Sequence, residues 1–261
     1  MILQLTHHKI FYDDLGTGDP VLLIHGFPLS HKIWEPQINF LVKQNFRVIA
    51  PDLRGFGNST SPGEVWEIND FADDVIALLD HLNVKKCSVI GMSMGGYIIF
   101  NLFKRYQHRF SNAVFIATKA SADDPATKER RNALISSARK IGIQTVTDAF
   151  KSILFNQDTY SENQELVDKV ERIMLSTSFN GIVGGMSAIR DRNDYVEDLQ
   201  NFYVPSLVIH GDSDKAVHFE NADVTASGLP DAELEIIKNA GHMVNLEAPE
   251  KINESILRFL K

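Results

Sequence analysis

The sequence has little of what would tie it to a disulfide framework, a membrane or a nucleic acid. Its 261 residues include one cysteine, Cys87, which excludes an intrachain disulfide and a multi-cysteine zinc site. No stretch approaches the roughly 20 apolar residues that a membrane-spanning helix needs. Lysine and arginine number 26 against 34 aspartates and glutamates, a net charge of −8. This acidic balance argues against binding to nucleic acid or to an anionic membrane.

Targeting and metal-binding motifs are also missing. The first residues contain no basic segment followed by an apolar run, so we expect a cytoplasmic protein. The chain has no H-E-x-x-H, no phosphate-binding glycine loop and no cluster of histidines and carboxylates, so we expect neither a metal nor a cofactor. We expect a monomer or a small homo-oligomer.

The sequence does contain an alternation of short apolar runs and helical patterns. Apolar residues make up 44% and charged residues 23%, the composition of a globular domain. Continuous apolar runs, typical of strands buried on both faces, occur at residues 21–24, 47–50, 88–90, 113–117 and 207–209, with further strands expected at 9–12 and 234–237. Helical patterns lie at 71–82, 95–106 and 249–260. This order predicts an α/β fold with a mostly parallel central sheet and helices on both faces.

One region breaks the alternation. Residues 119–199 show no convincing strand, whereas helical patterns recur at 125–140, 144–155, 165–175 and 182–190. We therefore expect a core domain of residues 1–118 and 200–261, with a helical cap or lid of residues 119–199 inserted after the sixth strand. The alternative is a helical subdomain with a purely structural role.

The strongest chemical signal is the sequence Gly91-Met92-Ser93-Met94-Gly95. This G-x-S-x-G follows an apolar strand and opens a helix, the context in which the motif forms a nucleophile elbow. The flanking glycines let the turn close and hold the Ser93 hydroxyl beyond the sheet in a strained conformation. The alternative is a glycine-rich helix start with an incidental serine.

A serine hydroxyl is a weak nucleophile, so it needs a base, and the base needs a carboxylate to orient it. His242, after the last expected strand, is the best candidate base. Two carboxylates follow the strand at 207–209: we expect Asp212 to bond the turn and prefer Asp214 as the partner of His242. The order Ser93, Asp214, His242 matches one fold among several that use this triad.

An oxyanion hole requires two backbone N–H groups near the nucleophile. One is expected from Met94, at the start of the helix that follows Ser93. The other is expected from Phe27, in the loop His25-Gly26-Phe27-Pro28 after an earlier strand. The alternative for this loop is a simple strand-ending turn.

These residues together resemble the α/β-hydrolase superfamily over essentially the whole chain. The motifs that carry the resemblance are His25 to Pro28, Pro51 to Ser59, Gly91 to Gly96, Gly211 to Asp214, and Gly241-His242 followed by Glu247 to Glu250. Within the superfamily the chain is similar to bacterial carboxylesterases related to cofactor-free haloperoxidases. Its helical insertion resembles that of 3-oxoadipate enol-lactonases.

The resemblance implies that Ser93, Asp214 and His242 fill the triad positions. It also implies that Asp52 and Arg54 are structural residues that hold a loop near the site. His218 stands where many relatives have a proline, which predicts a different local loop shape. Serine rather than aspartate at the elbow argues against a haloalkane dehalogenase or an epoxide hydrolase.

We expect a serine hydrolase that cleaves a small, mainly apolar carboxylic ester through an acyl-enzyme intermediate. The same triad also supports lactonase, thioesterase, perhydrolase and C–C hydrolase chemistry. A lactonase acting on a dicarboxylate-like ring would need a cation, for which Arg139 and Arg190 are candidates. An alternative of another class is a ligand-sensing module that turns over slowly.

The remaining residues receive plainer interpretations. Residues expected to line the substrate pocket lie beside the motifs or in the insertion: Phe27, Trp34, Met94, Met186 and Met243. Apolar residues at such positions are also typical of ordinary core. We expect His25 and His210 to serve packing or backbone bonding, and the run Glu129-Arg130-Arg131 to form a solvated helix face.

Overall fold

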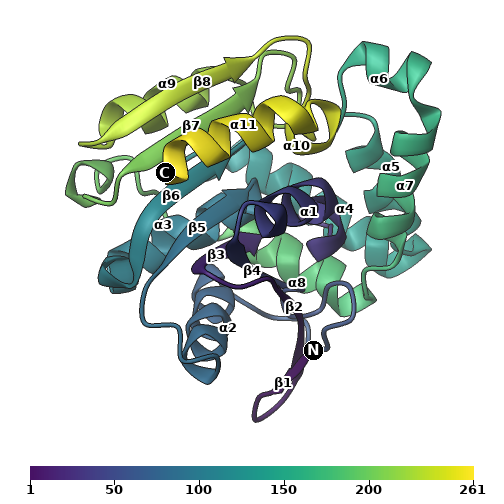
Figure 1. Cartoon of the computed structure of the whole chain (residues 1–261). Helices are drawn as coiled ribbons and strands as arrows, with labels where there is room; N and C mark the ends of the chain where they lie inside the picture. Colours follow the sequence, from purple (N-terminus) through teal and green to yellow (C-terminus); the bar gives the residue numbers. More distant parts are fainter.

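The computed structural model describes residues 1–261, and an eight-stranded sheet forms its centre (Figure 1). The strands lie in the order β1-β2-β4-β3-β5-β6-β7-β8. At one edge β1 pairs with β2 and β2 pairs with β4, both antiparallel. The six strands β4, β3, β5, β6, β7 and β8, in this order across the sheet, pair in parallel. Their bounds are Ile2–Gln4, Lys9–Leu15, Asp19–Ile24, Phe46–Pro51, Cys87–Met92, Phe110–Ile116, Ser206–Gly211 and Ala232–Ile237 for β1 to β8.

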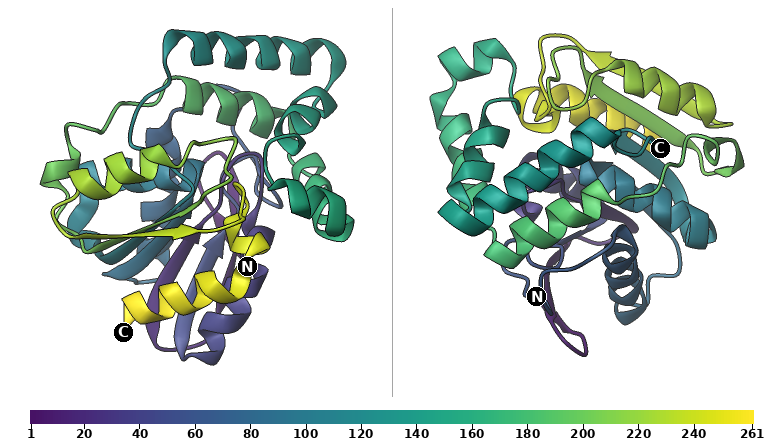
Figure 2. Two further views of the ribbon diagram at one scale, coloured as in Figure 1. Left: turned by 90° about the horizontal axis from the view of Figure 1, so that it is seen from above. Right: turned by 180° about the vertical axis from the view of Figure 1, so that it is seen from behind.

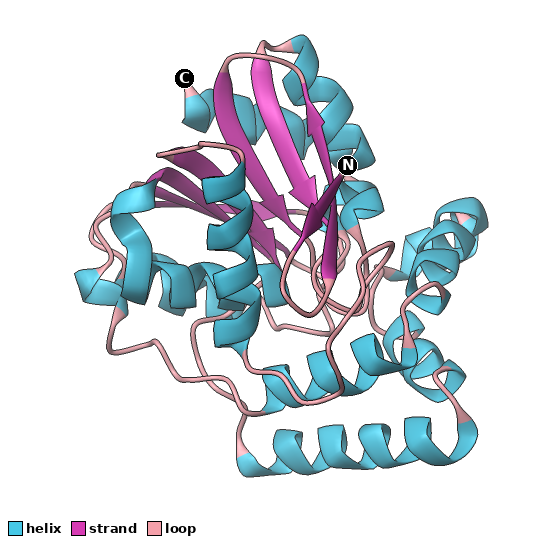
Figure 3. Cartoon of the chain, turned by 90° about the horizontal axis from the view of Figure 1, so that it is seen from below, coloured by secondary structure: helices cyan, strands magenta, loops and turns pink.

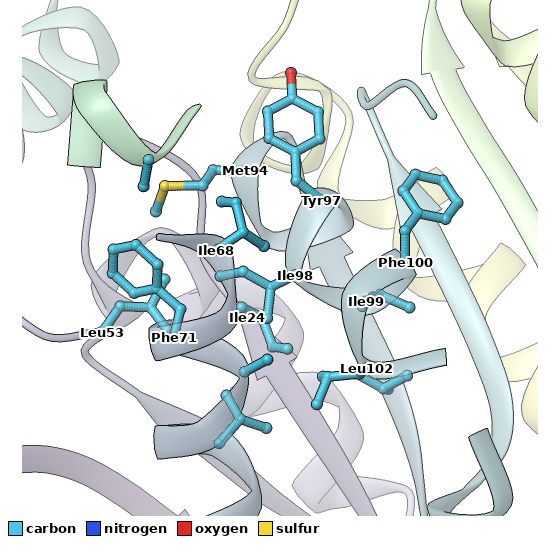
Figure 4. Packing of buried hydrophobic residues seen from close by; sticks show 14 of the residues in the cluster. Ile24, Leu53, Ile68, Phe71, Met94, Tyr97, Ile98, Ile99, Phe100 and Leu102 are labelled. Carbon is cyan, nitrogen blue, oxygen red and sulfur yellow. The ribbon is translucent and has the colours of Figure 1, made fainter. Parts of the chain in front are cut away.

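Helices cover both faces of the sheet, which explains the continuous apolar runs. In β3, Val21 and Leu23 pack into one hydrophobic cluster, and Leu22 and Ile24 pack into the other on the opposite face. One face carries α1 (Glu35–Lys43) and α11 (Pro249–Leu260), and the other carries α2 (Ile68–His81), α3 (Met94–Tyr106) and α9 (Glu220–Gly228). Figure 4 shows the packing of the second face. The predicted α/β fold with a mostly parallel sheet is confirmed.

Between β6 and β7 the chain forms helices and no strand. These helices are α4 (Pro125–Ile141), α5 (Gln144–Lys151), α6 (Gln157–Glu162), α7 (Gln164–Leu175) and α8 (Phe179–Arg190). We call residues 119–199 the helical insertion. α4 and α8 lie side by side in a layer of their own (Figure 2). The arrows of the parallel strands in Figure 3 point toward this layer, so the insertion covers the end of the sheet where the strands finish.

Helix α8 joins the insertion to the core by close backbone contact. A Cβ atom on Gly181 would lie 2.1 Å from the Gly55 carbonyl oxygen, and one on Gly184 would lie 2.5 Å from the Trp66 ring. Ser178, at the start of α8, donates a hydrogen bond of 2.8 Å to the same Gly55 carbonyl. Only glycine allows a helix to approach so closely, so α8 is the fixed part of the insertion.

Several elements were not expected from the sequence. They are β1, α1, α6, α9, α10 (Val244–Glu247) and three short 3₁₀ helices at His31–Trp34, Gln107–Arg109 and Leu199–Asn201. These segments are short or carry a mixed pattern of apolar and polar residues. Their conformation therefore depends on the core against which they pack. No helix is both long and apolar enough to cross a membrane.

Candidate active site

Ser93 occupies a sharp turn between β5 and α3. Its backbone has a φ of 52° and a ψ of −113°, a conformation that costs energy for a residue with a side chain. A Cβ atom on Gly95 would lie 2.2 Å from the Ile24 carbonyl oxygen, and one on Gly91 would lie 2.6 Å from the backbone of Gly95. The glycines of the motif are therefore required, because the start of α3 lies directly against β3 and β5.

Asp214 and His242 form a buried hydrogen-bonded pair. His242 Nδ1 lies 2.7 Å from Asp214 Oδ2, and both side chains are almost entirely excluded from solvent. Asp214 Oδ1 accepts the backbone N–H groups of Ala216 and Val217 at 2.8 and 2.9 Å. Burial alone would raise the pKa of Asp214, but the electrostatic interaction with His242 and the hydrogen bonds from His210 and His242 outweigh it and hold this pKa well below its usual range.

The choice between the two carboxylates of this loop follows from the same contacts. Asp212 is exposed, and its Oδ1 accepts the backbone N–H of Asn239 at 2.8 Å. The structure thus brings Asp214 to His242 and gives Asp212 to the turn. The Asp214 carboxylate can only accept a hydrogen bond, so Nδ1 of His242 carries the hydrogen that is donated to it. Nε2 of His242 is then the basic atom.

The loop after β3 lies directly against Ser93. A Cβ atom on Gly26 would lie 3.1 Å from Ser93 Cβ. The N–H of Phe27 donates no hydrogen bond within the chain. Met94 is the first residue of α3, where an N–H has no acceptor within the helix. Two backbone N–H groups without an acceptor therefore lie in the turns that meet at the serine.

His25 has a different role in this loop. Burial lowers its pKa to about 4, so the ring is neutral at physiological pH. Its Nδ1 bonds the Gly26 carbonyl at 2.8 Å and its Nε2 accepts the Leu53 N–H at 3.0 Å. The ring therefore ties the loop after β3 to the loop after β4, as expected of a residue that bonds the backbone.

Asp52 and Arg54 lie in the loop after β4 and make structural contacts. Asp52 Oδ1 accepts both the backbone N–H and the Nδ1 of His31, at 2.8 and 2.6 Å. Arg54 makes two hydrogen bonds of 2.7 Å to the Asp74 carboxylate on α2. These contacts fix the loop without placing either side chain in the wall of the cavity described next.

Ser93 and His242 line the same cavity, which has a volume of about 320 Å³. The helical insertion contributes much of its wall. The other lining residues are Phe27, Tyr97, Thr127, Arg130, Arg131, Leu134, Ala149, Phe150, Ile153, Ile189, Lys215, Ala216 and Val217. The wall is therefore mainly apolar, with three cations and no carboxylate. A larger cavity of about 570 Å³, between α1 and α7, contains none of these residues.

Of the five residues expected to line the pocket, the structure places only Phe27 in the wall. Trp34, Met94, Met186 and Met243 are fully buried in the core and do not line the cavity. The expectation used nearness in sequence to the motifs. It failed because successive residues of a turn or helix point in different directions, and these four point into packed interior.

The cations of the wall differ from those considered in the sequence. Arg139 pairs with Glu64 and Arg190 with Asp191, and neither lines the cavity. Of the run expected on a solvated helix face, Glu129 and Arg130 are exposed and Arg131 is partly buried, and both arginines also line the cavity. The pattern of α4 could not show this, because its exposed polar face is the one that turns toward the cavity.

Arg131 is held by a buried carboxylate. Asp123 has no exposed side-chain surface, accepts a hydrogen bond from Arg131 Nε and lies 2.9 Å from Arg192 Nη1. Burial would raise the pKa of Asp123, but Arg131 and Arg192 lower it below its ordinary value. The guanidinium of Arg192 in turn lies 4.2 Å from the centre of the Tyr97 ring on α3. A charged network therefore connects the insertion to the helix that follows Ser93.

A second connection joins the insertion to the loop that carries His242. Glu247 Oε2 accepts the Gly241 N–H at 2.7 Å, and Oε1 accepts the Asn156 N–H and the Thr159 hydroxyl, both at 2.8 Å. Burial raises the pKa of Glu247, and these three hydrogen bonds oppose the rise. The Met243 N–H also donates to the Leu154 carbonyl at 2.9 Å. The position of His242 is therefore tied to the insertion.

The other reactive groups do not form a second centre. Burial raises the pKa of Cys87 to about 12, so this thiol is not a nucleophile in the folded protein. No three histidine, cysteine, aspartate or glutamate side chains gather in a way that could hold a metal ion.

Comparison with known proteins identifies the family of the chain. Residues 19–249 match the family described as alpha/beta hydrolase fold. The AB hydrolase superfamily protein YisY of Bacillus subtilis is 32% identical over 97% of this chain and 96% of its own length. The bifunctional esterase/perhydrolase DCH of Acinetobacter calcoaceticus is 30% identical over 97% of this chain and 96% of its own.

Solved structures agree. A thermophilic esterase from Thermogutta terrifontis, solved with malate bound, superposes with a TM-score of 0.96 at 31% identity and covers 100% of this chain and 98% of its own. Relatives named as non-heme chloroperoxidase and 3-oxoadipate enol-lactonase also match. This chain is a member of the α/β-hydrolase family.

Proposed function

We propose that the protein is a serine hydrolase that cleaves small carboxylic esters through an acyl-enzyme intermediate. The observation that carries the proposal is the hydrogen bond of 2.7 Å between His242 Nδ1 and Asp214 Oδ2, with Ser93 and His242 lining one cavity. The esterases among the relatives support it.

In the proposed mechanism, Ser93 Oγ attacks the ester carbonyl while His242 Nε2 takes the hydroxyl proton. Asp214 holds the ring and stabilises the imidazolium that forms. The N–H groups of Phe27 and Met94 bind the oxyanion. The tetrahedral intermediate collapses, and the alcohol leaves with the proton from His242. Water then attacks the acyl-enzyme by the same route, which releases the acid and restores Ser93.

We propose that the helical insertion, residues 119–199, acts as a cap on a core made of residues 1–118 and 200–261. Leu134, Phe150 and Ile153 of the insertion face the cavity together with Phe27 and Tyr97 of the core. A cavity of about 320 Å³ with such walls fits a small ester with an apolar acyl group.

The proposal is tested by hydrolysis of p-nitrophenyl acetate, butyrate and octanoate, with Ser93→Ala beside the wild type. Loss of the nucleophile should lower turnover by a factor on the order of 10⁴ or more. The small rate that remains would come from the oxyanion hole. Equal rates in the two proteins would contradict it. Release of one equivalent followed by near-arrest in the wild type would favour the slow ligand-sensing module.

A second candidate function is hydrolysis of an anionic ester or lactone. Arg130 and Lys215 line the cavity and have no carboxylate partner, whereas Arg131 is paired with Asp123. Arg130 donates only to the Thr127 hydroxyl, at 2.7 Å. In a protein of net charge −8, two free cations in the wall favour a substrate that carries a carboxylate.

The two candidates are distinguished by a neutral and an anionic ester of similar length, methyl butyrate and monomethyl succinate. If the anionic ester is the better substrate, Arg130→Gln and Lys215→Gln should each raise its KM by about 3- to 10-fold, since exposed ion pairs are weak. Arg139→Gln, on the same helix but outside the cavity, is the control. A preference for the neutral ester that neither substitution alters would exclude the second candidate.

A further inference from the structure

A second buried histidine lies beside the acid of the proposed triad. His210, at the end of β7, has no exposed side-chain surface. Its Nε2 lies 2.8 Å from the Val217 carbonyl oxygen and 3.1 Å from Asp214 Oδ2. His210 does not line the cavity, so it reaches the reaction only through Asp214.

The contacts of His210 show which ring nitrogen carries a hydrogen. A backbone carbonyl can only accept, so Nε2 carries the hydrogen. Nδ1 is buried and has no hydrogen-bond partner. The Nε2–H donates to the Val217 carbonyl, and Asp214 Oδ2 lies 3.1 Å from the same nitrogen.

Both oxygens of Asp214 are in contact with nitrogen donors. Oδ1 accepts two backbone N–H groups of its own loop, while Oδ2 lies between the imidazoles of His242 and His210. A carboxylate held by donors on both oxygens cannot rotate freely, and each donor withdraws part of its negative charge.

We propose that His210 is a positioning residue that orients the Asp214 carboxylate and limits the negative charge this carboxylate presents to His242. The proposal rests on the proposed roles of Asp214 and His242. It accounts for a buried polar ring that packing alone would not select. Removal of the His210 N–H should concentrate negative charge on Asp214 Oδ2 and so stabilise the His242 imidazolium. His242 would then become protonated, and activity would fall, at a higher pH than in the wild type.

Other charges also face His242 and must stay constant in the test. They are Asp214 in the loop after β7, Glu247 on α10, which accepts the Gly241 N–H beside His242, and the cavity cations Lys215, Arg130 and Arg131. None of them contacts His210 except Asp214. A substitution at position 210 therefore changes one charged contact of the site.

The test compares His210→Leu with His210→Gln. Leucine fills the space without a donor, whereas glutamine places an amide N–H where the imidazole Nε2 lies. His218→Gln, an exposed position in the same loop, is the control. The measurement is kcat and KM for a p-nitrophenyl ester between pH 5 and 9, with melting temperatures recorded for each variant.

For His210→Leu we expect the acidic limb of the kcat profile to move to higher pH by on the order of one pH unit, the size of one hydrogen bond to a charged group. The plateau kcat should fall by roughly 10-fold at unchanged KM, because the carboxylate is less well oriented. His210→Gln should recover most of both. A folded leucine variant with the wild-type limb and kcat would overturn the proposal.

A spectroscopic readout separates failure of this proposal from failure of the proposed function. The proton between His242 Nδ1 and Asp214 gives a downfield ¹H resonance that needs no turnover. It should move further downfield in the leucine variant and return in the glutamine variant. If the leucine variant does not fold, His210→Asn takes its place, because the shorter amide of asparagine cannot reach Asp214. A resonance that is unchanged in His210→Gln and changed in His210→Asn then supports the proposal. An identical resonance in all folded variants would overturn it, even in a protein without esterase activity.

Discussion

The two sides of the candidate site are built in different ways. On the core side, the reacting groups sit on turns directly after strands, and the backbones of these turns touch. A Cβ atom on Gly26 would meet Ser93, and one on Gly211 would lie 2.2 Å from the Ala240 carbonyl oxygen. On the side of the helical insertion, α4 and α5 reach the cavity through side chains alone, such as Leu134 and Phe150.

This difference separates chemistry from selectivity. Backbone contact leaves the core side few alternative arrangements, so it can hold a nucleophile, a base and an acid in fixed geometry. Helices that meet through side chains tolerate substitution, so the side chains of α4 and α5 can change what the cavity accepts without disturbing the reacting groups. Variants on the core side should therefore lower kcat, whereas variants in the insertion should mainly change KM.

The largest effect is expected on the core side, at the acid. Asp214→Asn should lower kcat by about 10⁴-fold, because an amide cannot hold His242 in the correct tautomer or stabilise the imidazolium. Asp212→Asn, two residues away and bonded to the Asn239 N–H, should leave kcat nearly unchanged. Steady-state hydrolysis of p-nitrophenyl butyrate measures both. A larger loss in the Asp212 variant would reverse the assignment of the acid.

The same side was also the more predictable from sequence. Ser93, Asp214 and His242 each follow a strand or lie in a short motif, where backbone geometry imposes the neighbouring glycines and the chemistry of a triad requires the residue types. The structure brings Asp214 and His242 into hydrogen-bond contact and places Ser93 with His242 in one cavity wall. The order of strands and helices was predictable for a similar reason, since burial on both faces requires continuous apolar runs.

The wall of the cavity was not predictable. Arg130 and Arg131 carry the signature of an exposed helix face, and only the docking of α4 over the sheet makes that face part of the cavity wall. Trp34 and Met243 stand beside motif residues, yet both are fully buried in the core. His210 was expected to pack or to bond the backbone, and it does bond the Val217 carbonyl, but its contact with Asp214 depends on how the loop after β7 closes.

An intermediate effect is expected where the two sides meet. Glu247→Gln should lower kcat by roughly 10- to 100-fold. The carboxylate now accepts hydrogen bonds from three donors, and the NH₂ group of glutamine would face at least one of them, so that the His242 loop would shift. Glu250→Gln, at an exposed position in α11, is the matched control. Stopped-assay kinetics on one ester give kcat and KM. A change confined to KM would show that the contact shapes the cavity without positioning His242.

The smallest effect on chemistry is expected within the insertion, at the point where it is fixed. Gly181→Ala places a methyl group where the Gly55 carbonyl oxygen lies, so α8 must move away from the core. Overpacking of this kind should lower the free energy of unfolding by about 1–3 kcal/mol, partly offset by the better helix propensity of alanine. Thermal unfolding should show a melting temperature several degrees lower.

Ser187→Ala, on the same helix and without a side-chain hydrogen bond, should unfold like the wild type. KM for longer esters should change in Gly181→Ala more than kcat, because α8 carries Ile189 in the cavity wall while Ser93, Asp214 and His242 belong to the core. An equal loss of kcat and of stability would show that the insertion positions the reacting groups as strongly as the sheet does, and the division between chemistry and selectivity would not hold.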